Sequence, residues 1–231
     1  MASYSMEVIA HIHSQFPAKF GVPRQSGLVP ELEAEIRFTP PYRNASALRG
    51  LEGFSHIWLL WVFDQALREN WSPTVRPPRL GGNQRMGVFA TRSPFRPNPI
   101  GLSCVALAGI EANTPDGPIL RVRGADLMDG TPILDIKPYL PYADCRPGAA
   151  GGFAAAPPEA ALEVEIPEAL LAQVPEGERA ALRGVLAQDP RPRYQEDAER
   201  VYGMAFGGLE VRFVVEGRTL RVVAIEESGA H

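Results

Sequence analysis

Short runs of alternating hydrophobic and polar residues dominate the first 140 residues of the chain. In residues 6–13, Met6, Val8, Ala10 and Ile12 share one face, and residues 33–38 repeat the pattern. A period of two predicts β-strands with one buried face. Residues 56–63 are continuously apolar, which predicts a strand covered on both faces. Further strands are expected at residues 85–91, 101–112, 119–123 and 131–137.

Turn-forming residues separate these strands. Asn44 is a suitable N-cap for a short helix that ends at Gly50. The pairs Asp116-Gly117 and Asp129-Gly130 are typical of tight turns between strands. Many short strands with few helices favour a closed, single-sheet β-barrel, which leaves no sheet edge exposed. We therefore expect a mainly β fold.

The pattern changes after residue 145. Residues 146–160 are rich in Gly, Ala and Pro, which predicts a linker. A helix is expected at residues 176–188, followed by a hairpin that pairs residues 209–215 with 219–225. The expected organisation is a barrel domain at residues 1–145, a linker at 146–160 and a small α+β C-terminal domain at 161–231.

Composition narrows the protein class. The chain has 231 residues, 45% of them hydrophobic, and only two cysteines, Cys104 and Cys145, so a disulfide framework and a four-thiolate zinc site are both excluded. The longest apolar run, residues 57–63, is too short to span a membrane, and the N-terminus lacks the features of a signal peptide. His11 and His13 share a strand face without a third ligand, so no metal site is predicted. A cytoplasmic location is the simplest expectation.

Charge is unevenly distributed. The net charge is −4, but residues 1–150 carry +2 and residues 151–231 carry −6. Five arginines and no acidic residue lie between Asn70 and Ile110. All five belong to residues 76–101, where several prolines and glycines predict a stiff, ordered loop. Arginines on a stiff loop favour a confined anion-binding site, since arginine binds phosphate with two hydrogen bonds. A solvated loop, or one paired with acids from elsewhere, is the alternative.

Other polar residues are weaker candidates for a site. The turn-prone segment 23–27 contains Arg24 and Gln25, and Asp64-Gln65 follows the apolar strand. Asp126 and Asp129 have side chains that suit ribose hydroxyls, although aspartate is also common in turns. No phosphate-binding P-loop, nucleophile elbow or Rossmann glycine motif is present.

Two further segments combine charge with aromatic residues. Residues 135–142 hold Lys137, Tyr139 and Tyr142, side chains that bind phosphate, stack on bases or move protons, or that simply pack half-buried. Residues 189–194 carry Arg191 and Arg193 on a second stiff loop. That loop either extends an RNA-binding surface or fixes the end of the preceding helix, and the sequence favours neither.

Several long runs resemble one known family. The segments PRQSGLV, RGLEGFSHIWLLWVF, RPPRLGG, MGVFATRSPFRPNPIGLS, DGTPILDIKPYLPYAD and VLAQDPRPRY occur in the order typical of the TsaA-like family of tRNA (adenine-N6)-methyltransferases. The resemblance covers residues 6–146 and extends into the C-terminal region. It implies a β-barrel homodimer that uses S-adenosylmethionine to methylate N6 of N6-threonylcarbamoyladenosine beside the anticodon of threonine tRNA.

The resemblance also implies roles for individual residues. Its cofactor-binding positions correspond here to Arg24, Gln25, Ser26, Asp64, Gln65, Arg92, Leu102, Asp126, Leu127, Met128 and Asp129. The family is expected to carry His at the position of Asp64, so backbone contacts are expected there. Methyl transfer is mostly a matter of positioning, because the sulfonium already activates the methyl group. The N6 nitrogen is weakly nucleophilic, and we hypothesise that Lys137, Tyr139 and Arg92 assist its proton loss.

RNA binding is expected to use arginine side chains on phosphates, with bases stacked on aromatic groups. The candidates are Arg76, Arg79, Arg85 and Arg96 in the barrel domain and Arg191 and Arg193 in the C-terminal domain. Two alternatives remain at this stage. One is a non-catalytic module that binds S-adenosylmethionine or RNA. The other is a hydrolase of small anionic substrates, although the sequence shows no recognisable pair of nucleophile and base for it.

Overall fold

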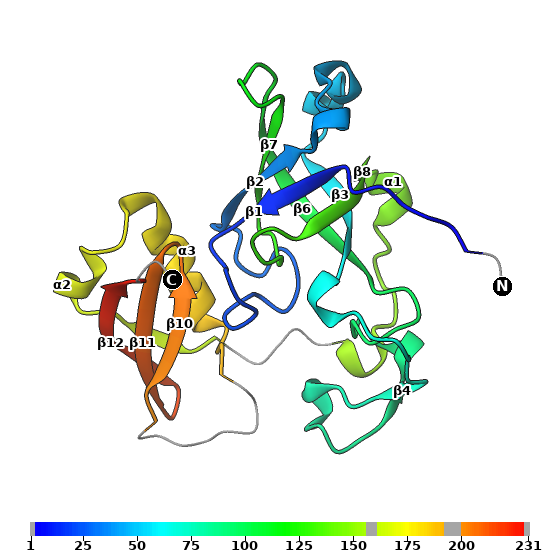
Figure 1. Cartoon of the computed structure of the whole chain (residues 1–231). Helices are drawn as coiled ribbons and strands as arrows, with labels where there is room; N and C mark the ends of the chain where they lie inside the picture. The colour runs from blue at the N-terminus through cyan, green and yellow to red at the C-terminus, as the bar shows by residue number, and fades with distance from the viewer. Residues whose placement is uncertain (1–2, 156–160, 192–199, 229–231) are drawn as a thin grey trace.

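A closed antiparallel barrel forms the larger body of the molecule (Figure 1). The computed structural model describes residues 3–155, 161–191 and 200–228. Six strands close the barrel in the order β1-β2-β7-β6-β3-β8. Their bounds are β1 (Ala10–His13), β2 (Glu33–Phe38), β3 (His56–Val62), β6 (Ile100–Glu111), β7 (Ile119–Arg123) and β8 (Pro132–Pro138). The predicted barrel is confirmed.

Alternation decides which side chains fill the barrel. Ile57, Leu59 and Trp61 of β3 point inward and are buried. They share a core with Ile12, Ile36, Leu120 and Ile133 from neighbouring strands. The outward residues Trp58, Leu60 and Val62 are only half-buried, so the prediction that this strand is covered on both faces is wrong. Burial alternates along β3 with a period of two, as in the neighbouring strands, although the outer face of β3 is also apolar.

The connection between β2 and β3 folds into three short 3-10 helices over one end of the barrel. They are η1 (Pro40–Tyr42), η2 (Ala45–Leu48) and η3 (Leu51–Gly53). The Asn44 side chain accepts a hydrogen bond from the Ser46 amide at 3.0 Å, which is the predicted cap. Gly50 follows with a φ of 89°, a left-handed conformation that favours glycine.

A long excursion joins β3 to β6, and we call residues 63–99 the β3–β6 connection. It contains η4 (Asp64–Ala66), β4 (Thr74–Val75), η5 (Pro78–Leu80), β5 (Met86–Gly87) and η6 (Val88–Ala90). The prediction of a strand over residues 85–91 is wrong, because only two residue pairs form between β4 and β5. Beyond them the chain coils into η6, where the Thr91 amide donates to the Val88 carbonyl. After β8, the short helices α1 (Pro141–Asp144) and η7 (Gly152–Ala154) follow.

The C-terminal body is a four-stranded sheet covered by a helix. The sheet has the order β10-β11-β12-β9, with β9 parallel to β12. Its elements are β9 (Glu163–Glu165), α2 (Glu168–Leu171), η8 (Glu176–Glu178), α3 (Arg179–Ala187), β10 (Tyr202–Phe206), β11 (Leu209–Glu216) and β12 (Thr219–Glu227). The predicted hairpin is β11–β12. Among the described residues, no helix has both the length and the hydrophobicity needed to cross a bilayer.

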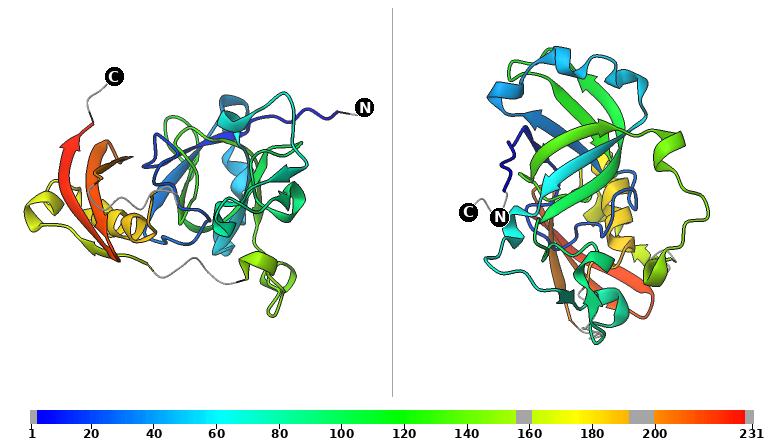
Figure 2. Two further views of the ribbon diagram at one scale, coloured as in Figure 1. Left: turned by 90° about the horizontal axis from the view of Figure 1, so that it is seen from below. Right: turned by 90° about the vertical axis from the view of Figure 1, so that its right-hand side faces the viewer.

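Part of the chain between β1 and β2 belongs to the C-terminal core. Phe16, Val29 and Leu32 are buried with residues of α3 and the C-terminal sheet. The Phe16 ring meets the Phe206 ring edge-on at 5.7 Å, and the Gly207 amide donates to the Gln15 carbonyl at 2.9 Å. The barrel and the C-terminal sheet therefore lie side by side across this segment (Figure 2).

Candidate active site

The loop formed by residues 23–27 is fastened to the end of β7. The Gly27 amide donates to the Gly124 carbonyl at 2.8 Å, and the Gly124 amide donates to the Leu32 carbonyl at 2.8 Å. A Cβ on Gly124 would lie 3.3 Å from backbone atoms of Gly27, so the close approach of the two backbones depends on the missing side chain of Gly124. This contact fixes the position of Arg24, Gln25 and Ser26 relative to the barrel.

Arg92 reaches this loop from the β3–β6 connection. Its guanidinium donates a hydrogen bond to the Gln25 side-chain oxygen, and the Gln25 side-chain nitrogen donates to the Arg24 carbonyl. The turn that carries Arg92 is itself ordered, since the Ser93 amide donates to the Thr91 hydroxyl oxygen at 3.2 Å. The structure thus brings together predicted cofactor residues that are far apart in the sequence.

A chain of hydrogen bonds runs from the barrel interior to Asp126. The Trp61 indole N–H donates to Ser103 Oγ at 3.0 Å, and the Ser103 hydroxyl donates to Asp126 Oδ1 at 2.6 Å. Burial raises the pKa of Asp126, although the Ser103 hydroxyl, the Ser26 backbone N–H and the positive charge of Arg92 oppose this shift. Asp126 and Arg92 therefore act on each other electrostatically.

Ser26 completes this cluster at the edge of β6. The Cys104 amide donates to Ser26 Oγ at 3.2 Å. The paired residues of β6 and β7 begin at Ala106 and Arg123, so β7 does not pair with Cys104. The serine hydroxyl takes the place of the missing strand partner. Arg92, Gln25, Ser26 and Asp126 therefore form one polar cluster where β7 leaves the barrel.

The predicted catalytic residue Lys137 lies on the outer face of the same sheet. Trp58 of β3 pairs with Cys104 of β6 on one side and with Lys137 of β8 on the other. Two strand spacings separate Cys104 from Lys137, a distance of about 10 Å between their Cα atoms. Lys137 Nζ lies 2.8 Å from Asp135 Oδ2.

Leu60 lies two residues after Trp58 on the same face of β3 and pairs with Leu102 and with Asp135. The Leu102 side chain is 52% exposed on this outer face. A cavity of about 340 Å³ opens here, and its lining includes Ile9, Leu60, Ile100 and Asp135. This face thus offers apolar contacts beside the Lys137–Asp135 ion pair.

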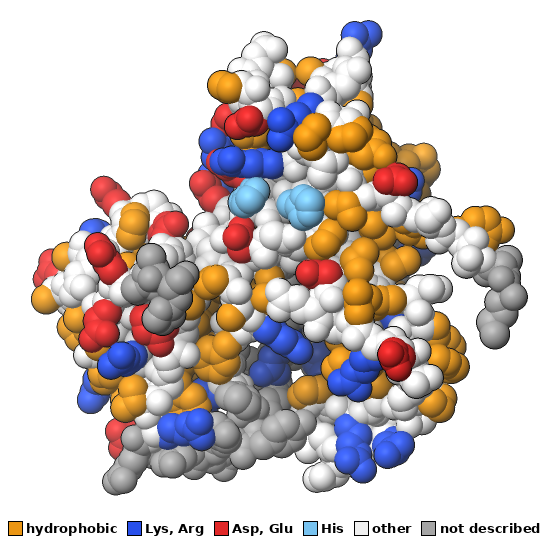
Figure 3. Space-filling model, viewed as in Figure 1, with side chains coloured by type: hydrophobic (Ala, Val, Ile, Leu, Met, Phe, Trp, Pro, Cys, Tyr) orange, Lys and Arg blue, Asp and Glu red, His pale blue; other side chains and the backbone are white. Residues whose placement is uncertain are grey.

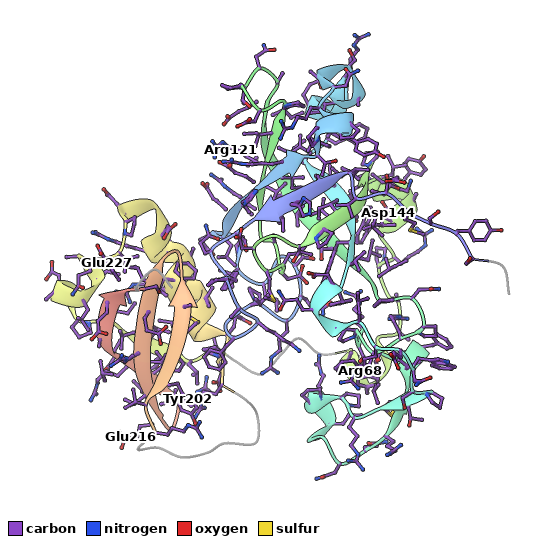
Figure 4. The ribbon with its side chains drawn as sticks, in the orientation of Figure 1. Arg68, Arg121, Asp144, Tyr202, Glu216 and Glu227 are labelled. Atoms are coloured by element: carbon purple, nitrogen blue, oxygen red, sulfur yellow. The ribbon has the colours of Figure 1, made fainter. Side chains whose placement is uncertain are left out.

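Tyr139 lies next to Trp58, with ring centroids 5.9 Å apart. Its pKa is raised by partial burial and by neighbouring Cys145, Cys104 and Asp144, so the phenol stays protonated at neutral pH. Asp144 Oδ2 accepts from the Leu140 amide at 2.8 Å and from the Trp58 indole at 3.0 Å, and these bonds lower its pKa. Asp144 lies in α1, just beyond the end of β8 (Figure 4).

The remaining predicted cofactor residues differ in their exposure. Asp64 and Gln65 are exposed in η4, which follows the end of β3 where Val62 pairs with Ile100. The Leu127 side chain is buried in the barrel core, so only the backbone of this residue is available to a ligand.

The chain then turns toward β1. The Met128 carbonyl accepts from the Thr131 hydroxyl at 2.8 Å. Asp129 Oδ1 accepts from the Ser14 amide at 3.1 Å and lies 3.3 Å from His13 Nδ1. Asp126 thus belongs to the polar cluster, whereas the Asp129 side chain contacts Ser14 and His13. Within the described residues, no group of three or more histidine, cysteine or acidic side chains is arranged to hold a metal ion.

The predicted RNA-binding arginines fall into two groups. Arg76, Arg79, Arg85 and Arg96 all lie on the β3–β6 connection, where positive side chains gather beside β4 (Figure 3). Arg191 lies on the C-terminal body, is only 15% exposed, and donates to both carboxylate oxygens of Asp189 at 2.8 and 2.9 Å. This pairing favours a role in fixing the end of α3. Arg193 lies outside the described residues.

Comparison with known proteins decides the family. Family models for the tRNA-methyltransferase O N-terminal domain and the TrmO C-terminal domain match residues 11–145 and 159–228. This chain belongs to the tRNA-methyltransferase O (TrmO) family. The TsaA-like resemblance found in the sequence is thereby confirmed.

Relatives of this TrmO-family chain match over nearly its full length. It is 46% identical to the Escherichia coli "tRNA (adenine(37)-N6)-methyltransferase" over 98% of this chain and 99% of that protein. It is 45% identical, over 91% of this chain and 92% of the other, to a Pseudomonas aeruginosa protein assigned by name to the S-adenosylmethionine-dependent methyltransferases. The crystal structure of TrmO from Pseudomonas aeruginosa aligns with a TM-score of 0.80 at 37% identity, covering 97% of this chain and 99% of the other.

Several residues of this TrmO-family site were not singled out from the sequence. Ser103 and Trp61 support Asp126, while Trp58 and Asp144 support Tyr139. Ser103 carried a usable signal, because it occupies an inward position in a largely apolar strand. A polar residue at a core position needs a hydrogen-bond partner, which points to a buried network.

Proposed function

We propose that this protein is an S-adenosylmethionine-dependent tRNA methyltransferase that methylates N6 of N6-threonylcarbamoyladenosine next to the anticodon of threonine tRNA. The reaction class rests on family membership and on the near-full-length relatives named above. One observation carries the assignment of the site: the Arg92 guanidinium reaches Gln25, on the loop that also carries Ser26, beside the buried carboxyl of Asp126.

The residues of the polar cluster have the chemistry that S-adenosylmethionine requires. The cofactor carries a carboxylate, an ammonium group, a sulfonium and ribose hydroxyls, so its site needs groups of both charges. Arg24 and Arg92 suit the carboxylate, and Asp126 suits the ammonium group or the ribose hydroxyls. Leu102 offers an exposed apolar surface to the adenine. Asp64, Gln65, Leu127, Met128 and Asp129 would contribute mainly through their backbone.

The bound cofactor supplies a methyl group already activated by the sulfonium, so the protein must chiefly hold the target nitrogen in line with it. N6 would gain a bond to the methyl carbon as the sulfur–carbon bond of the methyl donor breaks, and the N6 proton would pass to solvent water. Lys137 would stabilise negative charge that develops there, and the protonated Tyr139 would donate a hydrogen bond. Arg92 would assist the same step through its positive charge.

The tRNA substrate would meet Arg76, Arg79, Arg85 and Arg96 through its phosphates. The Asp189 pairing makes Arg191 a weaker candidate. By family resemblance the protein would act as a homodimer in the cytoplasm, where tRNA is modified. Sedimentation of the purified protein tests the dimer directly.

The decisive experiment measures transfer of labelled methyl from S-adenosylmethionine to threonine tRNA. Product that contains the label at N6 of the modified adenosine supports the proposal. Binding of the cofactor without transfer to any RNA would indicate a non-catalytic module, and product release without the methyl donor would indicate a hydrolase.

Lys137→Ala separates catalysis from cofactor binding. We expect its single-turnover rate to fall by about 100-fold, in the range usual for groups that assist proton transfer. Cofactor affinity measured by calorimetry should change less than threefold. Lys19→Ala removes the other lysine of the chain from an exposed position and serves as the matched control. An unchanged rate in Lys137→Ala would remove this residue from the chemistry.

A further inference from the structure

Two large aromatic side chains are exposed together on the β3–β6 connection. Trp71 is 50% exposed and Phe89 is 72% exposed. Their rings lie nearly parallel, with an interplanar angle of 29° and centroids 6.1 Å apart. Aromatic residues of this size usually contribute much of the buried area in cores and interfaces, so an exposed pair indicates a binding surface for a partner molecule.

The backbone holds this pair in place. Trp71 precedes β4 and Phe89 follows β5, and these strands pair through Thr74–Gly87 and Val75–Met86. The Val88 amide donates to the Pro73 carbonyl at 2.9 Å, which extends the pairing toward the two rings. The Ser72 hydroxyl donates to the Thr74 carbonyl at 2.8 Å and orders the turn between Trp71 and β4. Both rings are therefore positioned before any partner binds.

The surroundings of the pair are strongly positive. Residues 63–99 contain six arginines against two acidic residues, in a chain whose net charge is −4. Arg85 donates to the Thr74 hydroxyl at 3.0 Å, which holds this guanidinium on β4. Arg68, labelled in Figure 4, lies over the Phe95 ring at 3.7 Å. Flat rings among guanidinium groups match a ligand that offers planar bases and phosphates.

We propose that Trp71 and Phe89 form a stacking platform for an unpaired base of the tRNA substrate. The proposal rests on the function proposed above and adds residues that recognise the RNA through its bases rather than its phosphates. Anticodon-loop bases are single-stranded and available for stacking. A symmetric contact between two copies would instead place this positive connection against itself, which is electrostatically unfavourable.

Binding of a fluorescein-labelled anticodon stem-loop of threonine tRNA tests the platform. Trp71→Ala and Phe89→Ala should each weaken binding by about 5- to 150-fold, the range for loss of one stacked base. Trp71→Phe keeps an aromatic face and should stay within about threefold of the unmodified protein. The dependence of affinity on salt should not change in these variants, because stacking releases no counterions.

Leu67→Ser is the matched control, since Leu67 is 63% exposed on the same connection but has no aromatic face. It should bind the RNA as the unmodified protein does. Thermal unfolding followed by circular dichroism verifies that each variant is folded. Unchanged RNA affinity in Trp71→Ala and Phe89→Ala would overturn the proposal. If sedimentation instead showed that these variants dissociate from dimers to monomers, the aromatic pair would belong to a contact between two copies of the chain, which would also overturn it.

Methylation of full tRNA by the unmodified protein is measured in parallel. Transfer by the unmodified protein together with unaltered binding by Trp71→Ala refutes the platform and leaves the proposed function intact. Conversely, RNA binding that depends on Trp71 without any methyl transfer supports the platform and refutes the proposed methyltransferase activity.

Discussion

Phe16→Ala should destabilise both bodies of the protein together. Phe16 is 1% exposed and packs against Phe206, although it follows β1 of the barrel. Truncation of a buried phenylalanine costs about 3–5 kcal/mol through lost transfer free energy and the remaining cavity. At 2–4 °C per kcal/mol for a chain of this size, the melting temperature should fall by about 10 °C.

Two spectroscopic signals make this test specific. All three tryptophans, Trp58, Trp61 and Trp71, belong to the barrel and its β3–β6 connection, so their fluorescence in urea reports on that body. Far-ultraviolet circular dichroism reports on α3 and the C-terminal sheet as well. Because Phe16 joins the C-terminal core to β1, both transitions should shift to lower urea concentration.

Phe89→Ala is the matched control, because it removes the same atoms from a side chain that is 72% exposed. Its free energy of unfolding should change by less than about 0.5 kcal/mol. A loss below about 1 kcal/mol in Phe16→Ala would refute the reasoning. A shift confined to circular dichroism would show that residues 16–32 do not couple the two bodies.

Two further predictions concern the site. Because burial raises the pKa of Asp126, its carboxyl binds a proton more readily in the folded than in the unfolded chain, and its destabilising contribution at neutral pH disappears as pH falls through the raised pKa. In the absence of cofactor, Asp126→Asn should therefore match or exceed the unmodified protein in free energy of unfolding at pH 7. The difference between the two proteins, measured by urea titration, should shrink toward pH 4. A clearly lower free energy of unfolding for Asp126→Asn at pH 7 would contradict this prediction. Arg79→Ala should weaken tRNA binding and reduce the slope of log affinity against log salt by about one, and an unaltered slope would exclude a phosphate contact there.

The sequence predicted local structure well where alternation was strict. β2 and β7 occupy the expected residues 33–38 and 119–123, since each has one buried face. β10 was overlooked, although Tyr202, Met204 and Phe206 alternate inward. Periodicity identifies a buried position but not the element that covers it. For this reason Phe16, Val29 and Leu32 could not be placed in the C-terminal core from the sequence.

The candidate site was predictable only as a set of residues. Arg92 and Gln25 are separated by 67 positions, and no local pattern pairs them. Family resemblance grouped them, while the structure adds the contacts that relate them to Asp126 through Ser26 and Ser103. Resemblance also grouped Asp129 with Asp126, whereas the chain turns between them and directs Asp129 toward β1.

The β3–β6 connection links the two halves of the proposed reaction. It carries Arg92, which reaches Gln25 in the loop proposed to bind the cofactor, and also the Trp71–Phe89 pair and the arginines proposed to bind RNA. Tethering both functions to one ordered segment fixes the distance between a stacked base and the polar cluster. Preorganisation of this kind lowers the entropic cost of bringing the target nitrogen to the methyl group. Substitutions that loosen the connection without removing a side chain proposed to bind RNA or cofactor, such as Val88→Ala at a residue 1% exposed, should therefore lower the methylation rate more than the affinity for the cofactor.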